Sequence, residues 1–129
     1  MRLDGPIRNL VLPETIFHAG PLPYDWLLER ATAIVHHGGF GTTAAGLRAG
    51  IPAVIIPHII DQFIWGQRVY ELSAGPKPVP RTKLTAENLR QALEQAFRDE
   101  HLRQSAAALG EKIRAENGVQ QAIRLILSG

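Results

Sequence analysis

The chain has 129 residues, of which 45% are hydrophobic and 20% charged, with a net charge of +2 and no cysteine. This length fits one domain with its own core, and the absence of a basic block gives no indication of nucleic-acid binding. Disulfides and thiol catalysis are excluded. Because no apolar stretch is long enough for a bilayer and the first residues of the sequence lack an apolar signal core, we expect one cytoplasmic domain over residues 1–129.

Strands and helices are predicted to alternate over the first part of the chain. The expected elements are a β-prone run at 15–18, a short helix at 24–31, a strand at 33–35, a helix at 42–49, a strand at 52–57 and a helix at 61–72. The strands at 33–35 and 52–57 are continuously apolar, which is typical of a parallel sheet covered on both faces. Gly50, followed by Pro52, is placed to end the helix at 42–49.

The rest of the chain is predicted to be helical from about residue 84. A proline-rich connector at 77–83 comes first, and Thr85 is placed to cap the next helix. Helical spacing then relates Leu89, Leu93, Ala96 and Phe97, and two more helices are expected over 102–113 and 119–127. The sequence therefore predicts an α/β fold, a Rossmann-like parallel sheet with flanking helices. Three strands are few for a doubly wound domain, so we expect its N-terminal part to be incomplete.

The segment between the strand at 33–35 and the following helix has the composition of an anion-binding loop. A helix that follows a parallel strand has unpaired N–H groups at its start, and they suit a phosphate. The loop holds two histidines, three glycines and two threonines: His36, His37, Gly38, Gly39, Gly41, Thr42 and Thr43. Neighbouring extended residues point in opposite directions, so one imidazole is expected to face the anion and the other the core or solvent.

These residues alone leave two phosphate-bearing ligands open. Gly39-x-Gly41-x-x-Ala44, with Asp61 20 residues after Gly41, matches a relaxed dinucleotide fingerprint and fits a nicotinamide or flavin. The helix before Gly50 is short for that fold. A P-loop is excluded because no Gly-Lys-Ser/Thr occurs, and no cysteine–histidine cluster has zinc spacing, so we expect no metal site. The alternative to a ligand site is a tight strand-to-helix turn that needs glycine only for packing.

The remaining histidines are assigned no part in this loop. His58 and His101 are interpreted as surface or structural residues. His18 stays open, because it ends a predicted strand that could reach the same edge of the sheet.

The run HHGGFGTTAAGLRAGIPAVIIP followed by DQ resembles the donor-binding signature of nucleotide-sugar glycosyltransferases with the two-domain GT-B fold. In particular, the run resembles that of bacterial antibiotic, macrolide and sterol glycosyltransferases of family 1. PLPYDWLLERA also resembles the segment before that signature, and the resemblance extends from about residue 15 to residue 72. It implies the C-terminal, donor-binding half of a GT-B fold.

The resemblance implies a role for each matching position. His37, with Gly38 and Gly39 beside it, Gly41, Thr42 and Thr43 match the diphosphate site, and Asp61 and Gln62 match the pair that binds the donor sugar. Leu22 and Trp26 would lie near the nucleotide base. Ala45 stands where many relatives carry a ribose-binding glutamate, and the base-stacking tryptophan of plant relatives has no match, since Trp26 lies too close to the signature.

The resemblance also implies a reaction and what this chain lacks for it. In the family a hexose passes with inversion from a UDP- or TDP-sugar to a hydroxyl acceptor, without metal or other cofactor. The general base is a histidine of the N-terminal, acceptor-binding domain, so no catalytic residue is expected in this chain. We expect the chain to need that domain or a partner chain, and alone to transfer sugar slowly or not at all. A dinucleotide-binding domain and a non-catalytic subunit of a split glycosyltransferase are the alternatives.

Overall fold

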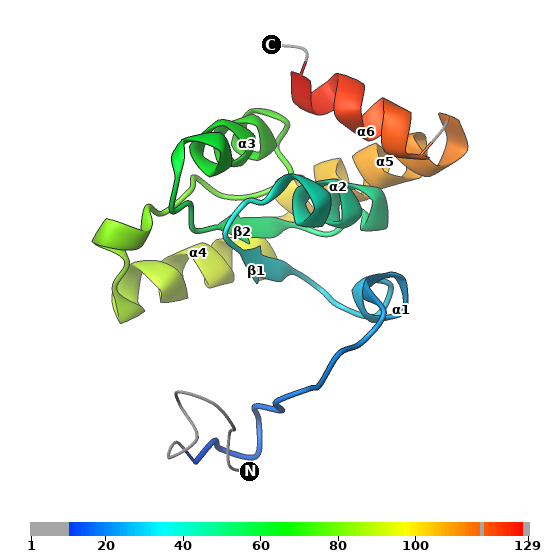
Figure 1. The fold of residues 1–129 in the computed structure, drawn as a ribbon. Coiled ribbons are helices and arrows are strands. Elements are labelled where there is room, and N and C mark those ends of the chain that lie inside the picture. The colour runs from blue at the N-terminus through cyan, green and yellow to red at the C-terminus, as the bar shows by residue number, and fades with distance from the viewer. Residues whose placement is uncertain (1–10, 117, 128–129) are drawn as a thin grey trace.

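Figure 1 shows a computed structural model of the protein, which describes residues 11–116 and 118–127. The elements are α1 (Tyr24–Leu28), β1 (Ile34–His36), α2 (Phe40–Ala49), β2 (Ala53–Ile55), α3 (Ile60–Glu71), a 3-10 turn (Arg81–Lys83), α4 (Ala86–Arg98), α5 (Glu100–Glu116) and α6 (Gly118–Leu127). The predicted alternation of strand and helix, followed by helices alone, is confirmed. Element ends differ from those predicted by a few residues, and α2 begins two residues earlier, at Phe40.

The centre of the fold is a β1–α2–β2 unit with parallel strands. Ile34 pairs with Ala53, and His36 pairs with Ile55. The N–H of Ile56 donates to the carbonyl of His36 at 2.8 Å, which extends the pairing past β2. Both strands therefore end at the same edge of the sheet, and the loops that lead into α2 and α3 begin there.

The predicted strand at 15–18 is wrong. This segment forms no strand, and the N–H of Ile16 instead donates to the carbonyl of Pro13 in a turn. Phe17 is 82% exposed, and the segment extends away from the folded body (Figure 1). A β-prone run becomes a strand only where a neighbouring strand takes up its backbone hydrogen bonds, and among the described residues the sheet holds two strands, β1 and β2.

The proline-rich connector lies along the outer edge of β2. The N–H of Val79 in the connector donates to the carbonyl of Ile55 at 3.0 Å. Just before the connector, the carbonyl of Ala74 accepts from the N–H of Ala53. This arrangement suits the prolines of the segment, because an edge position leaves one side of the backbone without ladder partners. The connector therefore covers an edge of β2 that would otherwise be open.

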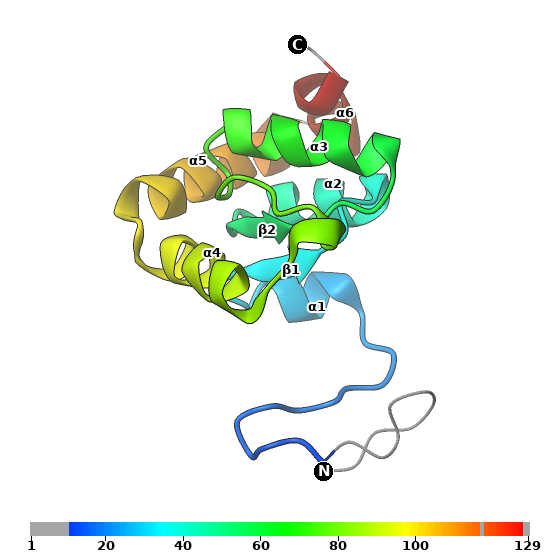
Figure 2. The same ribbon diagram turned by 90° about the vertical axis from the view of Figure 1, so that its left-hand side faces the viewer.

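The side chains of β2 alternate between two apolar layers. Ala53 and Ile55 pack with Leu47 of α2, Val69 of α3 and buried residues of α5 and α6. Val54 points the other way and packs with Ala92 and Ala96 of α4. Figure 2 shows α2 and α3 on one side of the strands and α4 on the other. This period of two, with both faces covered, confirms the prediction for the strand at 52–57. The same prediction is wrong for the strand at 33–35, because Val35 of β1 is 43% exposed.

The helical C-terminal part follows the predicted pattern. The hydroxyl of Thr85 accepts from the N–H of Asn88 at 3.1 Å, which confirms the predicted cap of α4. Gly50 ends α2 with φ 74°, also as predicted, and α5 packs across the end of α2. No helix within the described part of the chain is long and apolar enough to cross a membrane.

Candidate functional site

The two histidines at the end of β1 point in different directions. His36 is half-buried, and its Nε2 is buried without a hydrogen-bond partner among the described residues, whereas His37 is exposed. The N–H of Gly38 donates to Nδ1 of His36 at 3.0 Å, and the N–H of Gly39 donates to Nδ1 of His37 at 3.1 Å. Because each Nδ1 accepts, the proton of each neutral ring lies on Nε2. His37 therefore presents an N–H donor to solvent beside the loop.

Burial controls the protonation of His36. Desolvation, followed by repulsion from His37, lowers the pKa of His36 from 6.5 to about 4. The imidazole inside the fold is consequently neutral near pH 7.

Gly38 gives the loop its shape. Its φ of +92° is strained for other residues, and a Cβ there would lie 2.9 Å from Cγ2 of Ile55 and 3.0 Å from the carbonyl oxygen of Gln62. The backbone of the loop thus packs directly on β2 and on the first turn of α3. This glycine is required by the fold, and it brings the loop into contact with Gln62.

Gly41 has no such structural requirement. A Cβ at this position would meet no atom within 4 Å, and Gly41 lies in the first turn of α2. Gly39 is the N-cap residue of α2, and no side chain of the described residues caps that end of the helix. The N–H groups of the first turn therefore have no side-chain cap, and they lie at the positive end of the helix dipole.

The two threonines of the loop differ in exposure. Thr42 is half-buried, whereas Thr43 is 2% exposed. The hydroxyl of Thr43 donates to the carbonyl of Gly39 at 2.7 Å, and its N–H donates to the same oxygen at 2.9 Å. Thr43 therefore fixes the start of α2 from inside the fold and does not face the open space in front of the loop.

Asp61 and Gln62 lie in the first turn of α3, next to the loop. Asp61 is exposed. Oε1 of Gln62 accepts from the N–H of His58 at 2.7 Å and from the N–H of Ile59 at 3.2 Å, so the amide caps α3 with its oxygen. This capping role was not predicted from the sequence, although a glutamine at the third position of a helix is a known signal for it.

His58 also lies at this edge, which the sequence analysis did not foresee. Its ring meets that of His37 edge to face, with 6.1 Å between the ring centroids. Its Nδ1 lies 2.8 Å from the carbonyl oxygen of Ile56. The predicted interpretation of His58 as a surface residue is correct in that it is exposed, but the ring lies beside the loop.

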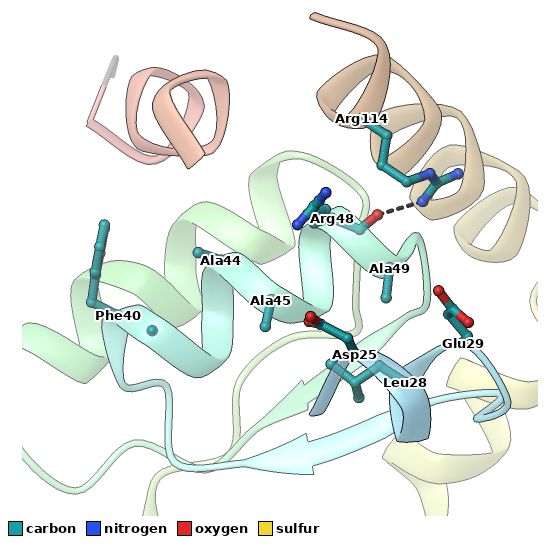
Figure 3. A pocket seen from close by; sticks show the side chains of 10 residues that line it. Asp25, Leu28, Glu29, Phe40, Ala44, Ala45, Arg48, Ala49 and Arg114 are labelled. Atoms are coloured by element: carbon teal, nitrogen blue, oxygen red, sulfur yellow. Dashed lines mark hydrogen bonds between the residues drawn. The ribbon is translucent and has the colours of Figure 1, made fainter. Parts of the chain in front are cut away.

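A cavity of about 600 Å³ opens on the other side of the loop, between α1, α2 and α5. Figure 3 shows the carboxylate of Asp25 directed from α1 toward α2, where Ala45 lies, and the guanidinium of Arg114 bonded to the carbonyl of Arg48. The lining residues are Asp25, Leu28, Glu29, Phe40, Gly41, Ala44, Ala45, Arg48, Ala49 and Arg114.

Leu22 and Trp26, predicted to lie near a nucleotide base, do not line this cavity. Trp26 is half-exposed, with the guanidinium of Arg30 4.4 Å from its ring centroid. Asp25, Leu28 and Glu29 of the same helix line the cavity instead. Sequence patterns did not single them out, because the cavity arises from the packing of α1 against α2.

The site thus has three adjoining parts, which are the uncapped start of α2, the first turn of α3 and the cavity beside Gly41. The described residues include no group of three or more histidine, aspartate or glutamate side chains arranged to hold a metal ion. The arrangement suits an elongated ligand with an anion at its centre and hydroxyl-bearing groups on both sides.

Comparison with known protein families gives one match that covers most of the chain. Residues 6–125 match the family described as "Erythromycin biosynthesis protein CIII-like, C-terminal domain".

Sterol 3-beta-glucosyltransferases are similar to this chain in sequence. One from Arabidopsis thaliana is 40% identical over 121 residues, which are 92% of this chain and 20% of that protein. One from Sclerotinia sclerotiorum is 46% identical over 118 residues, which are 92% of this chain and 8% of that protein. The chain therefore spans a fifth or less of these curated relatives.

Solved glycosyltransferase structures share the fold. The glycosyltransferase VinC in complex with DTDP superimposes with a TM-score of 0.74 and 26% identity, over 92% of this chain and 31% of VinC. The predicted α/β fold, with a parallel sheet and flanking helices as in GT-B glycosyltransferases, is confirmed.

Proposed function

We propose that this chain, which belongs to the family of erythromycin biosynthesis protein CIII-like C-terminal domains, binds the nucleotide-sugar donor of an inverting glycosyltransferase. The donor is a UDP- or TDP-hexose, and the acceptor is a hydroxyl group. The observation that carries the proposal is the uncapped first turn of α2. There a Cβ at Gly41 would meet no atom within 4 Å, Gly41 lines the cavity, and the exposed His37 is bonded to the N–H of Gly39 just before the helix.

The diphosphate is assigned to the start of α2. The N–H groups of Gly41 and Thr42 belong to the first helical turn, and Nε2–H of His37 offers a further donor. Gly38 and Gly39 hold the loop in place through the bonds already described. Because its hydroxyl is buried, Thr43 acts as a positioning residue and does not contact the phosphates.

The donor sugar is assigned to the first turn of α3. The exposed carboxylate of Asp61 suits the hydroxyls of a hexose, since a carboxylate accepts strong charge-assisted hydrogen bonds. Oε1 of Gln62 is engaged in capping, so its Nε2 is the atom available to a sugar oxygen.

The nucleoside is assigned to the cavity between α1 and α2. Gly41 lines this cavity, so a group attached to the phosphates has a direct path into it. Its walls supply the carboxylates of Asp25 and Glu29, which can accept hydrogen bonds from ribose hydroxyls. Fold similarity to a DTDP complex supports a thymidine donor, and a uridine donor is the second candidate.

In the proposed reaction the acceptor oxygen attacks the anomeric carbon from the face opposite the diphosphate. A carbon–oxygen bond forms, the bond to the diphosphate breaks with its electron pair on the leaving oxygen, and the hydroxyl proton passes to a general base. The helix dipole of α2 and Nε2–H of His37 stabilise the growing negative charge at a fixed position. No metal or other cofactor takes part.

The base and the acceptor site are assigned to an N-terminal acceptor-binding domain or a partner chain. Apolar side chains on the exposed side of α3 support such a neighbour, and Ile60 is 79% exposed and Ile64 54% exposed. The chain covers less than a third of VinC. We expect the isolated chain to bind donor in the micromolar to millimolar range, about −8 to −4 kcal/mol, with little or no transfer.

Titration of the chain with a UDP-sugar, a TDP-sugar and NAD, followed by NMR, tests the proposal. At least one nucleotide sugar should shift the amide signals of Gly41 and Thr42. Saturable NAD binding without a response to either nucleotide sugar would instead support the dinucleotide interpretation.

A graded series at Gly41 tests the phosphate position. Gly41→Ala and Gly41→Val should both fold, because a Cβ meets no atom there, and valine should weaken UDP binding more than alanine. Circular dichroism serves as the control for folding. Unchanged UDP affinity in a folded valine variant would remove the loop from the phosphate site.

A further inference from the structure

We propose that His58 binds the donor sugar by accepting a hydrogen bond from the hydroxyl nearest the phosphate, which is on C2 of the hexose. This inference rests on the proposed function, because it places a sugar beside a phosphate held at the start of α2. His58 belongs to the loop between β2 and α3, and it comes before the Asp61-Gln62 pair.

The hydrogen bonds of His58 define which of its nitrogens carries the proton. Its Nδ1 lies 2.8 Å from the carbonyl oxygen of Ile56, which can only accept, so Nδ1 must be the donor. In the neutral ring Nε2 then has a free lone pair. The backbone N–H of His58 is held by Oε1 of Gln62 at 2.7 Å, so both ends of the residue are fixed.

His37 has the opposite tautomer. Its Nδ1 accepts from the N–H of Gly39, so its Nε2 carries the proton. The two rings lie edge to face with 6.1 Å between their centroids, and both are exposed at the same edge of the sheet. One imidazole thus offers a donor and its neighbour an acceptor.

This pair matches the chemistry of a sugar phosphate. A phosphate only accepts hydrogen bonds, whereas a sugar hydroxyl can donate one. In a hexose 1-diphosphate the C2 hydroxyl stands next to the phosphate-bearing carbon. A ligand whose phosphate accepts from His37 therefore has the C2 hydroxyl close to the acceptor on His58, and its remaining hydroxyls lie toward Asp61.

The tautomers can be measured without any ligand. Long-range proton–nitrogen NMR spectra of the chain near neutral pH should show His58 protonated on Nδ1 and His37 on Nε2. The exposed His101 of α5 supplies an internal comparison in the same spectrum. A neutral His58 with its proton on Nε2 would overturn the proposal, because that atom would then no longer accept.

Two substitutions distinguish the roles of the two ring nitrogens of His58. His58→Asn keeps a donor at the position of Nδ1 and removes the atom at Nε2, whereas His58→Gln carries an amide oxygen to the reach of Nε2. UDP-glucose affinity should fall about twofold to tenfold in the asparagine variant, as expected for one hydrogen bond, and less in the glutamine variant. UDP affinity should stay the same in both, and His101→Asn should change neither.

UDP-2-deoxyglucose, which lacks the C2 hydroxyl, tests whether His58 contacts this group. The wild-type chain should bind it more weakly than UDP-glucose, and His58→Asn should bind the two sugars equally. An equal loss of UDP and UDP-glucose affinity in His58→Asn, or a 2-deoxy effect that persists in this variant, would overturn the assignment. A wild-type chain that binds no nucleotide sugar would instead refute the proposed function itself, so the two failures are distinguishable.

Discussion

Removing the half-buried imidazole of His36 should make the stability of the fold less sensitive to acid. Burial and repulsion from His37 lower the pKa of His36 to about 4, against 6.5 for an unperturbed histidine. In the neutral ring, Nδ1 accepts a hydrogen bond from the N–H of Gly38. A proton added to Nδ1 would meet that N–H, so the hydrogen bond would be lost. Between these two pH values the unfolded chain binds a proton that the folded chain does not. Stability contributed by neutral His36 is therefore complete above pH 6.5 and is lost as the pH falls toward 4.

The pKa difference sets the size of the effect. At about pH 4.5 linkage gives roughly 2.5 kcal/mol of lost stability, and this is an upper value because the side chain keeps some contact with water. Against the roughly 5–15 kcal/mol by which typical domains are stable, a change of this size is measurable.

The test compares urea unfolding of the wild type and His36→Asn at about pH 7 and about pH 4.5. Asparagine can still accept from the N–H of Gly38 but does not titrate in this range. The wild type should lose about 2.5 kcal/mol more than the variant between the two conditions. Thr85→Ala is the matched control, because loss of the α4 cap should cost about 1 kcal/mol at both pH values. Equal losses in the wild type and His36→Asn would refute the reasoning.

Three further predictions concern the loop and the ligand. Gly38→Ala should destabilise the fold by about 1–3 kcal/mol in urea unfolding, because of its positive φ and close contacts, whereas Gly41→Ala should not; equal effects would contradict the different requirements of the two glycines. Asp61→Ala should weaken UDP-sugar binding about tenfold or more in calorimetry while UDP binding changes little, and an equal loss for both ligands would exclude Asp61 from the sugar site. A chelator should leave UDP-sugar affinity unchanged, so a loss that added Mg²⁺ restores would disprove the metal-free proposal.

The parts of the fold that depend on local pattern were predictable from the sequence. The apolar runs at 33–35 and 52–57 predicted a parallel pair, and the alternation of an extended chain predicted that His36 and His37 would point apart. Thr85 and Gly50 were placed correctly because a helix end needs a capping hydroxyl or a left-handed residue.

The parts that depend on long-range contacts were not predictable in the same way. The strand at 15–18 was wrong because β-propensity does not supply a partner strand. The cavity walls contributed by Asp25 and Glu29 follow from how α1 packs on α2. The contact of His58 with His37 joins two loops that are about twenty residues apart, and no local pattern encodes it.

The glycines of the loop show why a signature can be recognised before its parts are understood. In the sequence Gly38 and Gly41 look alike, and both count toward a phosphate-binding pattern. In the structure a side chain at Gly38 would collide with Ile55 and with the backbone of Gln62, whereas one at Gly41 would project into open space. Folding alone therefore explains the first glycine but leaves the second without a reason. A ligand that must approach the backbone at Gly41 supplies that reason, and the uncapped N–H groups around it indicate that the ligand is an anion.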